Sequence, residues 1–256
     1  MTSLMRSKIL TAVKQFFADV PPEATIGVAV SGGSDSVAML LALREALPVA
    51  KLRAATVNHG LRAEAAAEAR WVKALCLSLG IAHDILPVRD LAPGSNLQAR
   101  ARMVRYDALA AWGQECNQLC LGHSQTDLAE TFLIRLARGS GVDGLCAMQA
   151  RWQDRAIDWV RPLLAFSRAD LRVYLGECGQ SWCDDPSNDD PAYTRVQMRQ
   201  AQPQLDDLGL SAERLAKTAL RMSNVQEALT FSLKALRPTV MQLDFGDVVF
   251  LFLIYH

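Results

Sequence analysis

A short glycine–serine segment between two regular elements most constrains how this chain can fold. Residues 31–36 read Ser-Gly-Gly-Ser-Asp-Ser and join the apolar run Thr25–Val30, a predicted strand, to the predicted helix Ser36–Ala46. A strand that leads through two glycines into a helix leaves unpaired backbone N–H groups at the positive end of that helix. Such a turn suits polyphosphate, because glycine lets the main chain approach phosphate oxygens closely. The alternative is an ordinary strand–turn–helix connection built from small polar residues.

The side chains of this segment add hydroxyl donors and one carboxylate, Asp35, which can hold a magnesium ion that offsets phosphate charge. The segment is not a Walker A motif, because no Gly-Lys-Ser/Thr follows, and it lacks the Gly-x-Gly-x-x-Gly spacing of dinucleotide sites. We expect this segment to bind a polyphosphate through Ser31, Gly32, Gly33, Ser34 and Ser36, with Asp35 holding the magnesium ion.

Short β-rich runs alternate with helical runs along most of the chain, which is typical of a parallel α/β sheet flanked by helices. The predicted strands are Thr25–Val30, Leu52–Asn58, His83–Val88, Gln118–Leu121 and Ala156–Val160. The predicted helices are Ser3–Phe17, Ser36–Ala46, Ala63–Leu79, Leu97–Trp112, Asp127–Arg138 and Arg168–Cys178. Ser31–Ser36, Asn58-His59 and His123–Asp127 each follow a strand. They should therefore converge at one edge of the sheet.

The character of the chain changes after Pro203. Apolar residues at helical spacing predict a helix over Leu208–Leu236, ended by Pro238, and Met241–Tyr255 resembles a hairpin around Gly246-Asp247. We expect a catalytic domain over 1–203 and a helical linker with a short C-terminal segment over 204–256, whose abrupt apolar end is compatible with truncation. The apolar tail is far too short to span a membrane.

Composition excludes a general affinity for nucleic acid, because the net charge is zero and the pI is about 6.9. The basic residues are 21 Arg and only 6 Lys, and Arg suits bidentate phosphate contacts, although an Arg excess also follows from GC-rich coding sequence. Any RNA-binding surface should therefore be local. The six Cys show no Cys-x-x-Cys pair, and the N-terminus does not resemble a secretory signal, so we expect reduced thiols in a cytoplasmic protein.

The segment 121–131 carries a second group of polar residues that can bind a metal ion or take part in catalysis. His123 lies at a predicted strand end, and Asp127 and Glu130 are three residues apart on the following helix, so they share a face. Opposite Asp35, these carboxylates can share a magnesium ion that bridges triphosphate oxygens. The alternative is that Asp127 only complements the helix N-terminus and that His123 is a hydrogen-bonded loop residue.

Two further segments can bind a polyanion. Arg102 and Arg105 share a helix face beside Tyr106, although a solvated face explains them equally well. The turn-rich acidic segment 184–191 is followed by Arg195 and Arg199 and can grip RNA or close over a substrate. Arg138 opens a Gly-rich helix exit, where a simple helix cap is the alternative. We expect the tryptophans at 152, 159 and 182 to be core residues.

With these residues in place, the chain resembles the bacterial tRNA(Ile)-lysidine synthases within the N-type ATP pyrophosphatase (PP-loop) group. The shared features run in order over Ile26–Arg199. They are Ser31–Ser36, Val57–Arg62, Ala101-Arg102 with Arg105-Tyr106, Gly122–Thr131, Arg138–Leu145, Arg161–Leu164, Arg168–Leu175 and Asp185–Asn188. The first segment identifies the PP-loop group, and the later segments narrow the resemblance to the lysidine enzymes.

The resemblance implies a ligase that forms a C–N bond. It implies that ATP adenylates the wobble cytidine of tRNA(Ile) with a CAU anticodon, that free L-lysine then displaces AMP, and that the products are lysidine, AMP and pyrophosphate. The implied ATP-binding residues are Ser31–Ser36, Asn58 and His59, with Mg²⁺ on Asp35 and Asp127. The implied catalytic residues are Asp35, His123, Asp127 and Glu130. The implied RNA-binding residues are Arg102, Arg105, Arg138, Asn188, Arg195 and Arg199. No membrane partner is implied, and a homodimer is left open.

The chain departs from the family pattern at a few positions. The family usually carries His-His-x-Asp-Asp-Gln before Ala-Glu-Thr, whereas this chain has Ser124, Thr126 and Leu128 in place of one His, one Asp and the Gln. An Arg-Asn pair is replaced by Arg195-Val196, and many relatives continue into a further tRNA-binding domain. Two alternatives therefore stay open: a PP-loop tRNA thiolase, for which paired Cys would be expected, and an adenine-nucleotide-binding module without catalysis.

Overall fold

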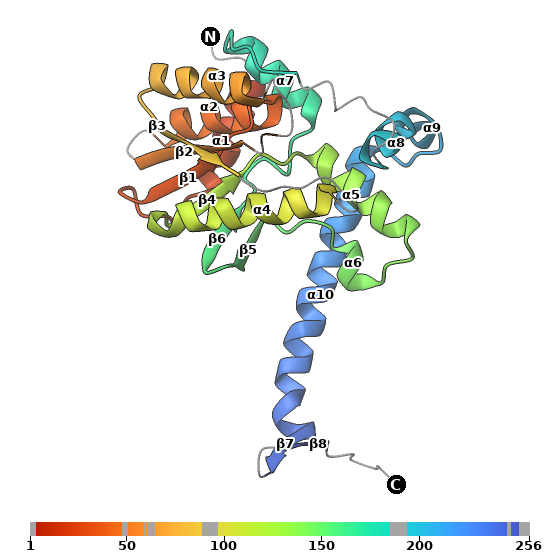
Figure 1. Cartoon of the computed structure of the whole chain (residues 1–256). Helices are drawn as coiled ribbons and strands as arrows, with labels where there is room; N and C mark the ends of the chain where they lie inside the picture. The colour runs from red at the N-terminus through yellow and green to blue at the C-terminus, as the bar shows by residue number, and fades with distance from the viewer. Residues whose placement is uncertain are drawn as a thin grey trace.

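A six-stranded sheet forms the centre of the molecule in a computed structural model that describes residues 4–47, 51–58, 60, 65–88, 97–184, 194–244 and 247–250 (Figure 1). The strands lie in the order β3-β2-β1-β4-β6-β5, and each is parallel to its neighbours except β5, which pairs antiparallel with β6. Their bounds are β1 Thr25–Ala29, β2 Lys51–Asn58, β3 Ala82–Pro87, β4 Gln118–Leu121, β5 Arg151–Asp154 and β6 Ile157–Val160. The predicted α/β fold is confirmed, but β5 was not predicted.

Helices cover both faces of this sheet. Helices α1, α2, α3 and α7 pack on one face and share its apolar core, in which Ile9, Met39 and Tyr174 are fully buried. Helix α4 packs on the other face through Tyr106 and Leu109. The bounds are α1 Leu4–Phe16, α2 Ser34–Ala46, α3 Ala65–Ser78, α4 Leu97–Trp112 and α7 Arg168–Glu177, with a 3₁₀ turn at Gly113–Glu115. Each predicted helix in this part of the chain is confirmed to within two residues at each end.

The strand order reverses direction between β1 and β4. From β1 the chain adds β2 and β3 on one side, whereas β4 and β6 lie on the other side. In open parallel sheets, ligands bind beyond the carboxyl ends of the two strands at such a reversal, because the outgoing loops there leave a crevice. The segment Ser31–Ser36, which we predict to bind phosphate and name the phosphate-binding segment, follows β1, and the His123 segment follows β4. The fold therefore brings these two segments to the place where a ligand is expected.

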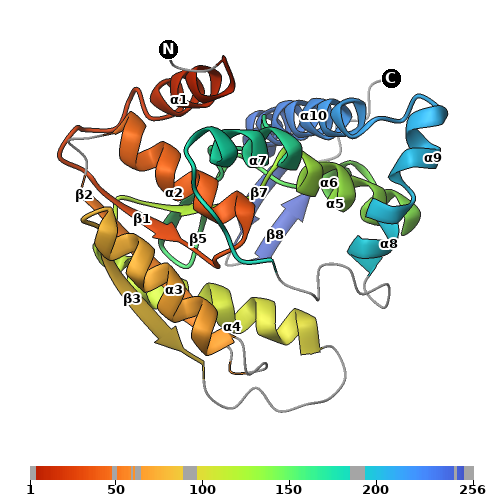
Figure 2. The same ribbon diagram turned by 90° about the horizontal axis from the view of Figure 1, so that it is seen from above.

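A second group of helices lies beyond β4, on the side of the molecule opposite β3 (Figure 2). Its helices are α5 Gln125–Ala137, α6 Val142–Leu145, α8 Thr194–Gln200, α9 Gln202–Asp207 and α10 Ala212–Val240. Leu128 and Phe132 of α5 pack against Leu215 and Ala219 of α10 in a separate apolar cluster. None of the helices in the described ranges is long and apolar enough to cross a membrane.

Helix α10 extends away from the body and carries a two-stranded hairpin at its far end (Figure 1). The hairpin strands are β7 Met241–Asp244 and β8 Asp247–Phe250, and the remainder of the predicted hairpin lies outside the described residues. The prediction that Pro238 ends the helix is wrong, because α10 continues to Val240. A proline removes one helical hydrogen bond, but the residues after it can still donate to carbonyls one turn earlier.

Candidate active site

The phosphate-binding segment is held in shape by one serine hydroxyl. Ser36 Oγ donates to the Gly33 carbonyl oxygen at 2.9 Å and accepts from the backbone N–H of Ser31 at 3.2 Å. Gly32 has a φ of +96°, which strains any residue with a Cβ. Because these contacts fix the turn before α2 begins, the backbone at the N-terminus of α2 is preorganised for an anion.

Gly122 directly follows β4 and packs against the backbone at the start of α2. A Cβ on Gly122 would lie 2.7 Å from Ser36 Cα and 2.9 Å from Ser36 N, closer than real Cβ atoms approach backbone. The glycine thus permits direct backbone contact between the two strand-end segments. This contact places His123 and the N-terminus of α5 beside the phosphate-binding segment.

Asp127 has a structural role in addition to its place in the site. Ser124 is the N-cap of α5, and Asp127 Oδ2 accepts from the Ser124 N–H and hydroxyl, both at 2.9 Å, in a capping box. Burial raises the pKa of Asp127, but the charge of Arg168, together with the hydrogen bond from the Ser124 N–H, outweighs this and lowers the pKa below its ordinary value. Of the other family departures, Thr126 Oγ1 accepts from the Arg168 N–H at 3.2 Å, and Leu128 is fully buried in the α5–α10 cluster.

Arg168, at the first turn of α7, connects the acidic residues of the site. Its guanidinium lies 3.3 Å from Asp35 Oδ2, 3.0 Å from Asp127 Oδ1 and 3.7 Å from Glu130 Oε1. Arg199 of α8 pairs with the same Glu130 oxygen at 2.9 Å. Burial raises the pKa of Asp35, helped by the negative charge of Asp127 and opposed by Arg168. Three carboxylates are thus balanced by two arginines.

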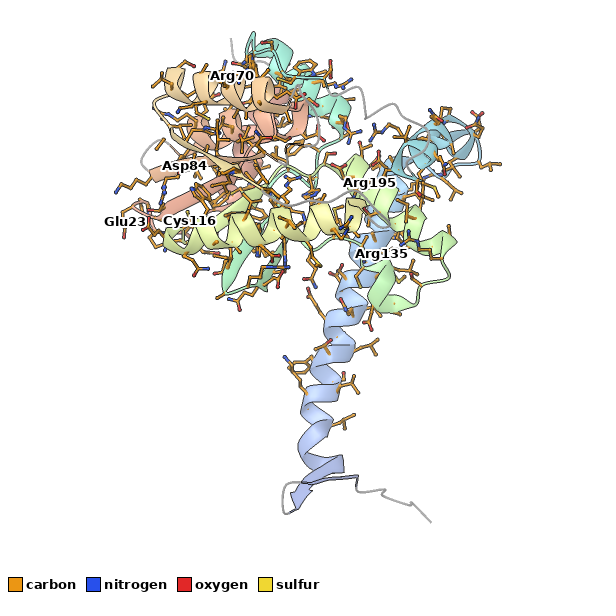
Figure 3. All side chains as sticks on the ribbon, viewed as in Figure 1. Glu23, Arg70, Asp84, Cys116, Arg135 and Arg195 are labelled. Atoms are coloured by element: carbon orange, nitrogen blue, oxygen red, sulfur yellow. The ribbon has the colours of Figure 1, made fainter. Side chains whose placement is uncertain are left out.

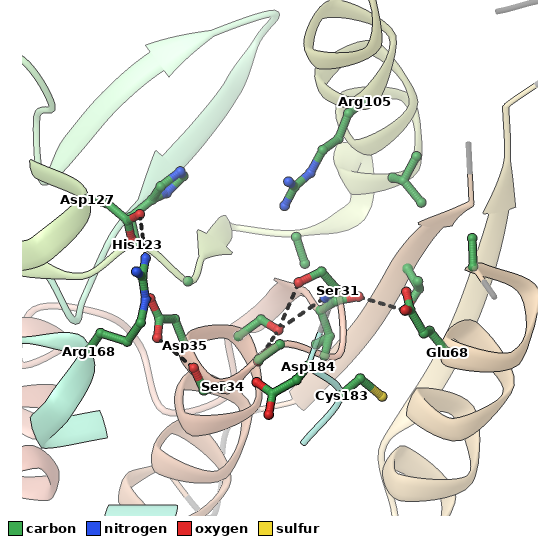
Figure 4. A pocket seen from close by; sticks show the side chains of 18 of the residues that line it. Ser31, Ser34, Asp35, Glu68, Arg105, His123, Asp127, Arg168, Cys183 and Asp184 are labelled. Carbon is green, nitrogen blue, oxygen red and sulfur yellow. Dashed lines mark hydrogen bonds and ion pairs between the residues drawn. The ribbon is translucent and has the colours of Figure 1, made fainter. Parts of the chain in front are cut away.

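Asp35, Asp127, Arg168 and Arg199 line a cavity of about 730 Å³. Figure 4 shows Asp35, Asp127 and Arg168 on one side of the cavity, with Arg105 reaching from α4 toward the space between them and Ser31. The cavity is also lined by Ser34, Ser36, Thr56, Glu68, His123, Arg172, Cys183, Asp184, Arg195 and Arg199. Its size lies within the range of small-molecule sites.

His123 is oriented by an arginine outside the cavity. Arg161 Nε donates to His123 Nδ1 at 3.2 Å, and arginine has no acceptor, so Nδ1 carries a lone pair and Nε2 carries the proton. Burial and the charge of Arg161 hold the pKa of His123 well below its ordinary value. His123 therefore presents a neutral imidazole, which suits hydrogen bonding to a phosphate oxygen.

The structure places the predicted residues at different distances from the cavity. The cavity lining includes predicted residues from three groups, namely Ser31, Gly33, Ser34, Asp35, Ser36, Arg105, His123, Asp127, Arg195 and Arg199. Glu130, 4% exposed, lies behind Arg168 and Arg199, and Asn58 accepts from the Gly60 N–H at the end of β2. Arg138 is the exposed C-cap of α5, and Arg102 lines a neighbouring groove. His59 and Asn188 lie outside the described residues.

Sequence reasoning gave no role to two arginines that organise the site. Arg168 follows the N-cap of a predicted helix, and Arg161 precedes a proline, so neither carries a local signal of its partners. Glu68 and Cys183 also line the cavity and were not predicted, whereas Asp184 begins the segment 184–191 that was predicted to contact RNA or substrate. The Cys183 N–H donates to the Gly32 carbonyl at 2.9 Å, which attaches the segment after α7 to the phosphate-binding segment.

The carboxylates present fit a magnesium ion that arrives with a triphosphate. Asp35 and Asp127 line one wall, and within the described ranges no group of three or more His, Cys, Asp or Glu is suited to a metal. Magnesium is commonly bound by one or two carboxylates while phosphates and water supply the other ligands. The cation that these two carboxylates contact in the structure is Arg168.

Comparison with solved structures identifies the same fold. The U34-tRNA thiolase NcsA from Methanococcus maripaludis, described with its [4Fe-4S] cluster, superposes with a TM-score of 0.72 at 16% identity, covering 87% of this chain and 79% of that chain. Identity this low shows the fold and not the reaction.

Sequence comparison defines the family more narrowly. A tRNA(Ile)-lysidine synthase from Ruegeria pomeroyi is 40% identical over 89% of this chain and 55% of that protein, and one from Zymomonas mobilis is 42% identical over 70% and 56%. This chain thus spans little more than half the length of these relatives. The synthase from Rhodopseudomonas palustris is 38% identical over 93% of this chain and 70% of that protein. A family model described as the PP-loop domain matches residues 5–205. The chain belongs to the PP-loop domain family and, within it, to the tRNA(Ile)-lysidine synthase family.

Proposed function

We propose that this protein ligates lysine to the wobble cytidine of tRNA(Ile) with a CAU anticodon, using ATP and a cytidine adenylate intermediate. The observation that carries this proposal is the meeting of the Ser31–Ser36 segment with Asp35, Asp127 and Arg105 around one cavity of about 730 Å³. The identity to the lysidine synthases supports the choice of substrates. A reaction with these substrates belongs in the cytoplasm.

In the first step, the 2-carbonyl oxygen of cytosine attacks the α-phosphorus of ATP and pyrophosphate leaves. Attack at phosphorus needs alignment and charge neutralisation and no protein nucleophile. The amides of the Ser31–Ser36 segment would hold the β- and γ-phosphates, and Asp35 and Asp127 would hold Mg²⁺, which neutralises phosphate charge. His123 Nε2 and Arg105, which line the same cavity, would donate to the oxygens that gain charge.

In the second step, the ε-amine of lysine attacks C2 of the adenylated base. A C–N bond forms, the C–O bond to AMP breaks, and the amine must lose a proton, so a carboxylate is needed nearby. Asp127 lines the cavity and is our candidate base. Glu130 lies behind Asp127 and would position Arg168 and Arg199 through its ion pairs with them. Its second oxygen, Oε2, is buried without a hydrogen-bond partner among the described residues.

The RNA would approach from the side of α4 and α8. Arg105 and Arg195 line the cavity from these helices, and neither forms an ion pair with a described carboxylate. Burial and the positive charges of Arg102 and Arg195 lower the pKa of Arg105, so this side of the site favours an anion. Arg138, Arg199 and Asn188 remain proposed RNA contacts.

The decisive experiment is incubation with ATP, radiolabelled lysine and the CAU-anticodon tRNA, followed by nucleoside analysis. We expect ATP-dependent label in the wobble nucleoside, and none in a tRNA with another wobble base. ATP hydrolysis without label would contradict the proposal. ATP binding without any turnover would favour the second candidate, a nucleotide-binding module without catalysis.

A thiolase activity is the other alternative, suggested by the likeness of the fold to NcsA. Sulfur transfer or an iron–sulfur cluster would require cysteines gathered at the cavity. Figure 3 shows Cys116 at the opposite end of α4 from Arg195, and Cys120 is buried in the sheet, so these two thiols lie away from the cavity lining. All six cysteines are free, and Cys183 contributes one thiol to the cavity. The arrangement therefore favours ligation over thiolation.

A further inference from the structure

A second, smaller hollow lies beside the main cavity, on the α4 side of the sheet. This hollow, the Arg102 groove, has a volume of about 320 Å³. It is formed between α4 and the β5–β6 hairpin, and its lining is Ala99, Arg102, Met103, Tyr106, Trp152, Asp154, Arg155 and Arg161. The mechanism above uses none of these residues in direct contact with substrate.

One wall of the groove is rigid and is shared with the main cavity. Trp152 stacks on the buried Trp159 with an interplanar angle of 14°, and the Arg161 guanidinium carbon lies 3.8 Å above the Trp152 ring. Arg161 donates to His123, which lines the main cavity. A single layer of side chains therefore separates the groove from the reaction centre.

The groove carries an uncompensated positive charge at one end. Arg102 is exposed, donates to Tyr106 Oη at 3.1 Å and has no acidic partner among the residues that the structure describes. Arg155, at the other end, is neutralised by Asp107 and Asp154. Burial lowers the pKa of Arg105 and of Arg161, and repulsion from the positive charge of Arg102 lowers both further. An anion bound at Arg102 would relieve this repulsion.

Two arginines of α4 connect the main cavity to the Arg102 groove. Arg105 lines the main cavity and Arg102 lines the groove, and the two are one helical turn apart on α4, on the order of 5 Å along the axis. A strand that places one nucleotide in the main cavity has Arg102 within reach of a neighbouring phosphate. Beside Arg102, the exposed side chain of Met103 offers an apolar, polarisable surface for a base.

We propose that the Arg102 groove binds the nucleotide adjacent to the reacting cytidine, with its phosphate at Arg102 and its base against Met103 and the edges of Tyr106 and Trp152. This inference rests on the proposed RNA substrate and extends it to a second site. The groove makes the enzyme read a dinucleotide and not an isolated base.

The test measures binding of RNA hairpins that carry the CAU anticodon loop, by fluorescence anisotropy. The protein variants are Met103→Glu and Arg102→Gln, both at exposed positions that should not affect folding. Val173→Glu, at an equally exposed apolar position on α7, and Arg221→Gln, on α10, are the matched controls. Three RNA variants each lack one base: the base on the 5′ side of the cytidine, the base on its 3′ side, or a base in the hairpin stem.

We expect Met103→Glu to weaken binding of the intact hairpin about 10-fold or more, because a carboxylate replaces the apolar, polarisable surface that the base would contact. The loss of affinity caused by Met103→Glu should shrink to about 3-fold or less on one of the two hairpins that are abasic next to the cytidine. It should persist on the hairpin that is abasic in the stem. Arg102→Gln should lower the salt dependence of binding. ATP binding should be unchanged in both variants, and the controls should behave as wild type.

Equal penalties on all hairpins, or none, would overturn the groove as a nucleotide site. Lysine incorporation by the wild-type protein, assayed in parallel, separates the two proposals. If lysine is incorporated but the effect of Met103→Glu does not depend on the abasic position, the proposed ligase activity stands and the groove is not a nucleotide site. Absence of both RNA binding and incorporation removes both.

Discussion

Arg168 controls the electrostatic balance of the candidate site at the scale of single residues. Its guanidinium contacts Asp35, Asp127 and Glu130, and its side chain is only 21% exposed. Asp35 and Asp127 repel each other when both are charged, so their joint ionisation depends on a shared cation. Arg168 supplies that cation in the protein without nucleotide.

Replacing Arg168 should destabilise the protein in a pH-dependent manner. We expect Arg168→Met to lower the free energy of unfolding at pH 7 by about 2–3 kcal/mol, because partly buried carboxylates lose their partner. The pKa of Asp127, now held below its ordinary value by Arg168, would rise. Because burial raises the pKa of Asp127 once Arg168 is removed, the variant's carboxyl is protonated at a higher pH than the wild type's, so the difference from wild type should shrink as the pH falls from 7 toward 4.

Denaturant unfolding at pH 7, 5 and 4 measures this difference. Arg172→Met, one turn along α7, is the control, because its ion pair with Asp184 is exposed and should contribute under about 1 kcal/mol. A penalty for Arg168→Met that does not change with pH would show that the arginine acts through packing.

Asp35 provides the second prediction at this scale. We expect Asp35→Asn to reduce pyrophosphate release on the order of 10²–10³-fold, since it removes a charge beside the triphosphate while keeping the size of the side chain. Its thermal stability should stay close to wild type, because burial already disfavours the charged carboxylate. Pyrophosphate release is measured by a coupled assay, with Asp207→Asn on the remote α9 as control. Undiminished release would remove Asp35 from the mechanism.

At the scale of elements, the contact of β4 with α2 depends on one glycine. Gly122→Ala would place a Cβ 2.7 Å from Ser36 Cα, so one of the two segments must move. We expect a loss of about 1–3 kcal/mol in unfolding free energy together with weaker ATP binding, because the Ser31–Ser36 segment is displaced. Gly176→Ala, inside α7 with open space around it, should instead stabilise by about 0.5–1 kcal/mol.

Calorimetric titration with ATP and magnesium distinguishes the two effects. If Gly122→Ala lowers stability but binds ATP as wild type does, the contact supports the fold without shaping the phosphate-binding segment.

Elements with clear boundaries could be predicted from the sequence, and contacts between distant residues could not. The bounds of α4 and β4 agree with the prediction, because an asparagine precedes and a glycine follows each of them. The convergence of Asp35 and Asp127 followed from the rule that strand ends share an edge. By contrast, β5 reads Arg-Trp-Gln-Asp and lacks the apolar pattern of a strand, so only its pairing with β6 identifies it. Arg168 lies 133 residues from Asp35, a separation that leaves no local signal.

At the scale of the whole molecule, the domain boundary at residue 203 stays a prediction, but packing crosses it. Leu215 and Ala219 of α10 are buried against α5, the helix that carries Asp127. Farther along α10, Leu229 and Phe231 are 51% and 75% exposed. The packed part of α10 therefore belongs to the same folded unit as the site.

We expect a chain that ends at residue 203 to melt at lower temperature than one that ends at residue 226, and to bind ATP more weakly. The first loses the buried Leu215, whose removal alone should cost about 2–4 kcal/mol, whereas Leu229→Ala should change stability by under about 0.5 kcal/mol. Scanning calorimetry of the two chains and the point variants measures these differences in melting temperature. Equal melting temperatures would place the boundary at residue 203.

The long separation between Asp35 and Arg168 also affects how the protein is made. The ribosome completes the phosphate-binding turn early, yet the arginine that balances Asp35 emerges 133 residues later. A nascent chain therefore carries half a site, with acidic groups that lack their counterion. The ion pair between Asp35 and Arg168, and with it the charge balance of the candidate site, can form only after translation has passed α7.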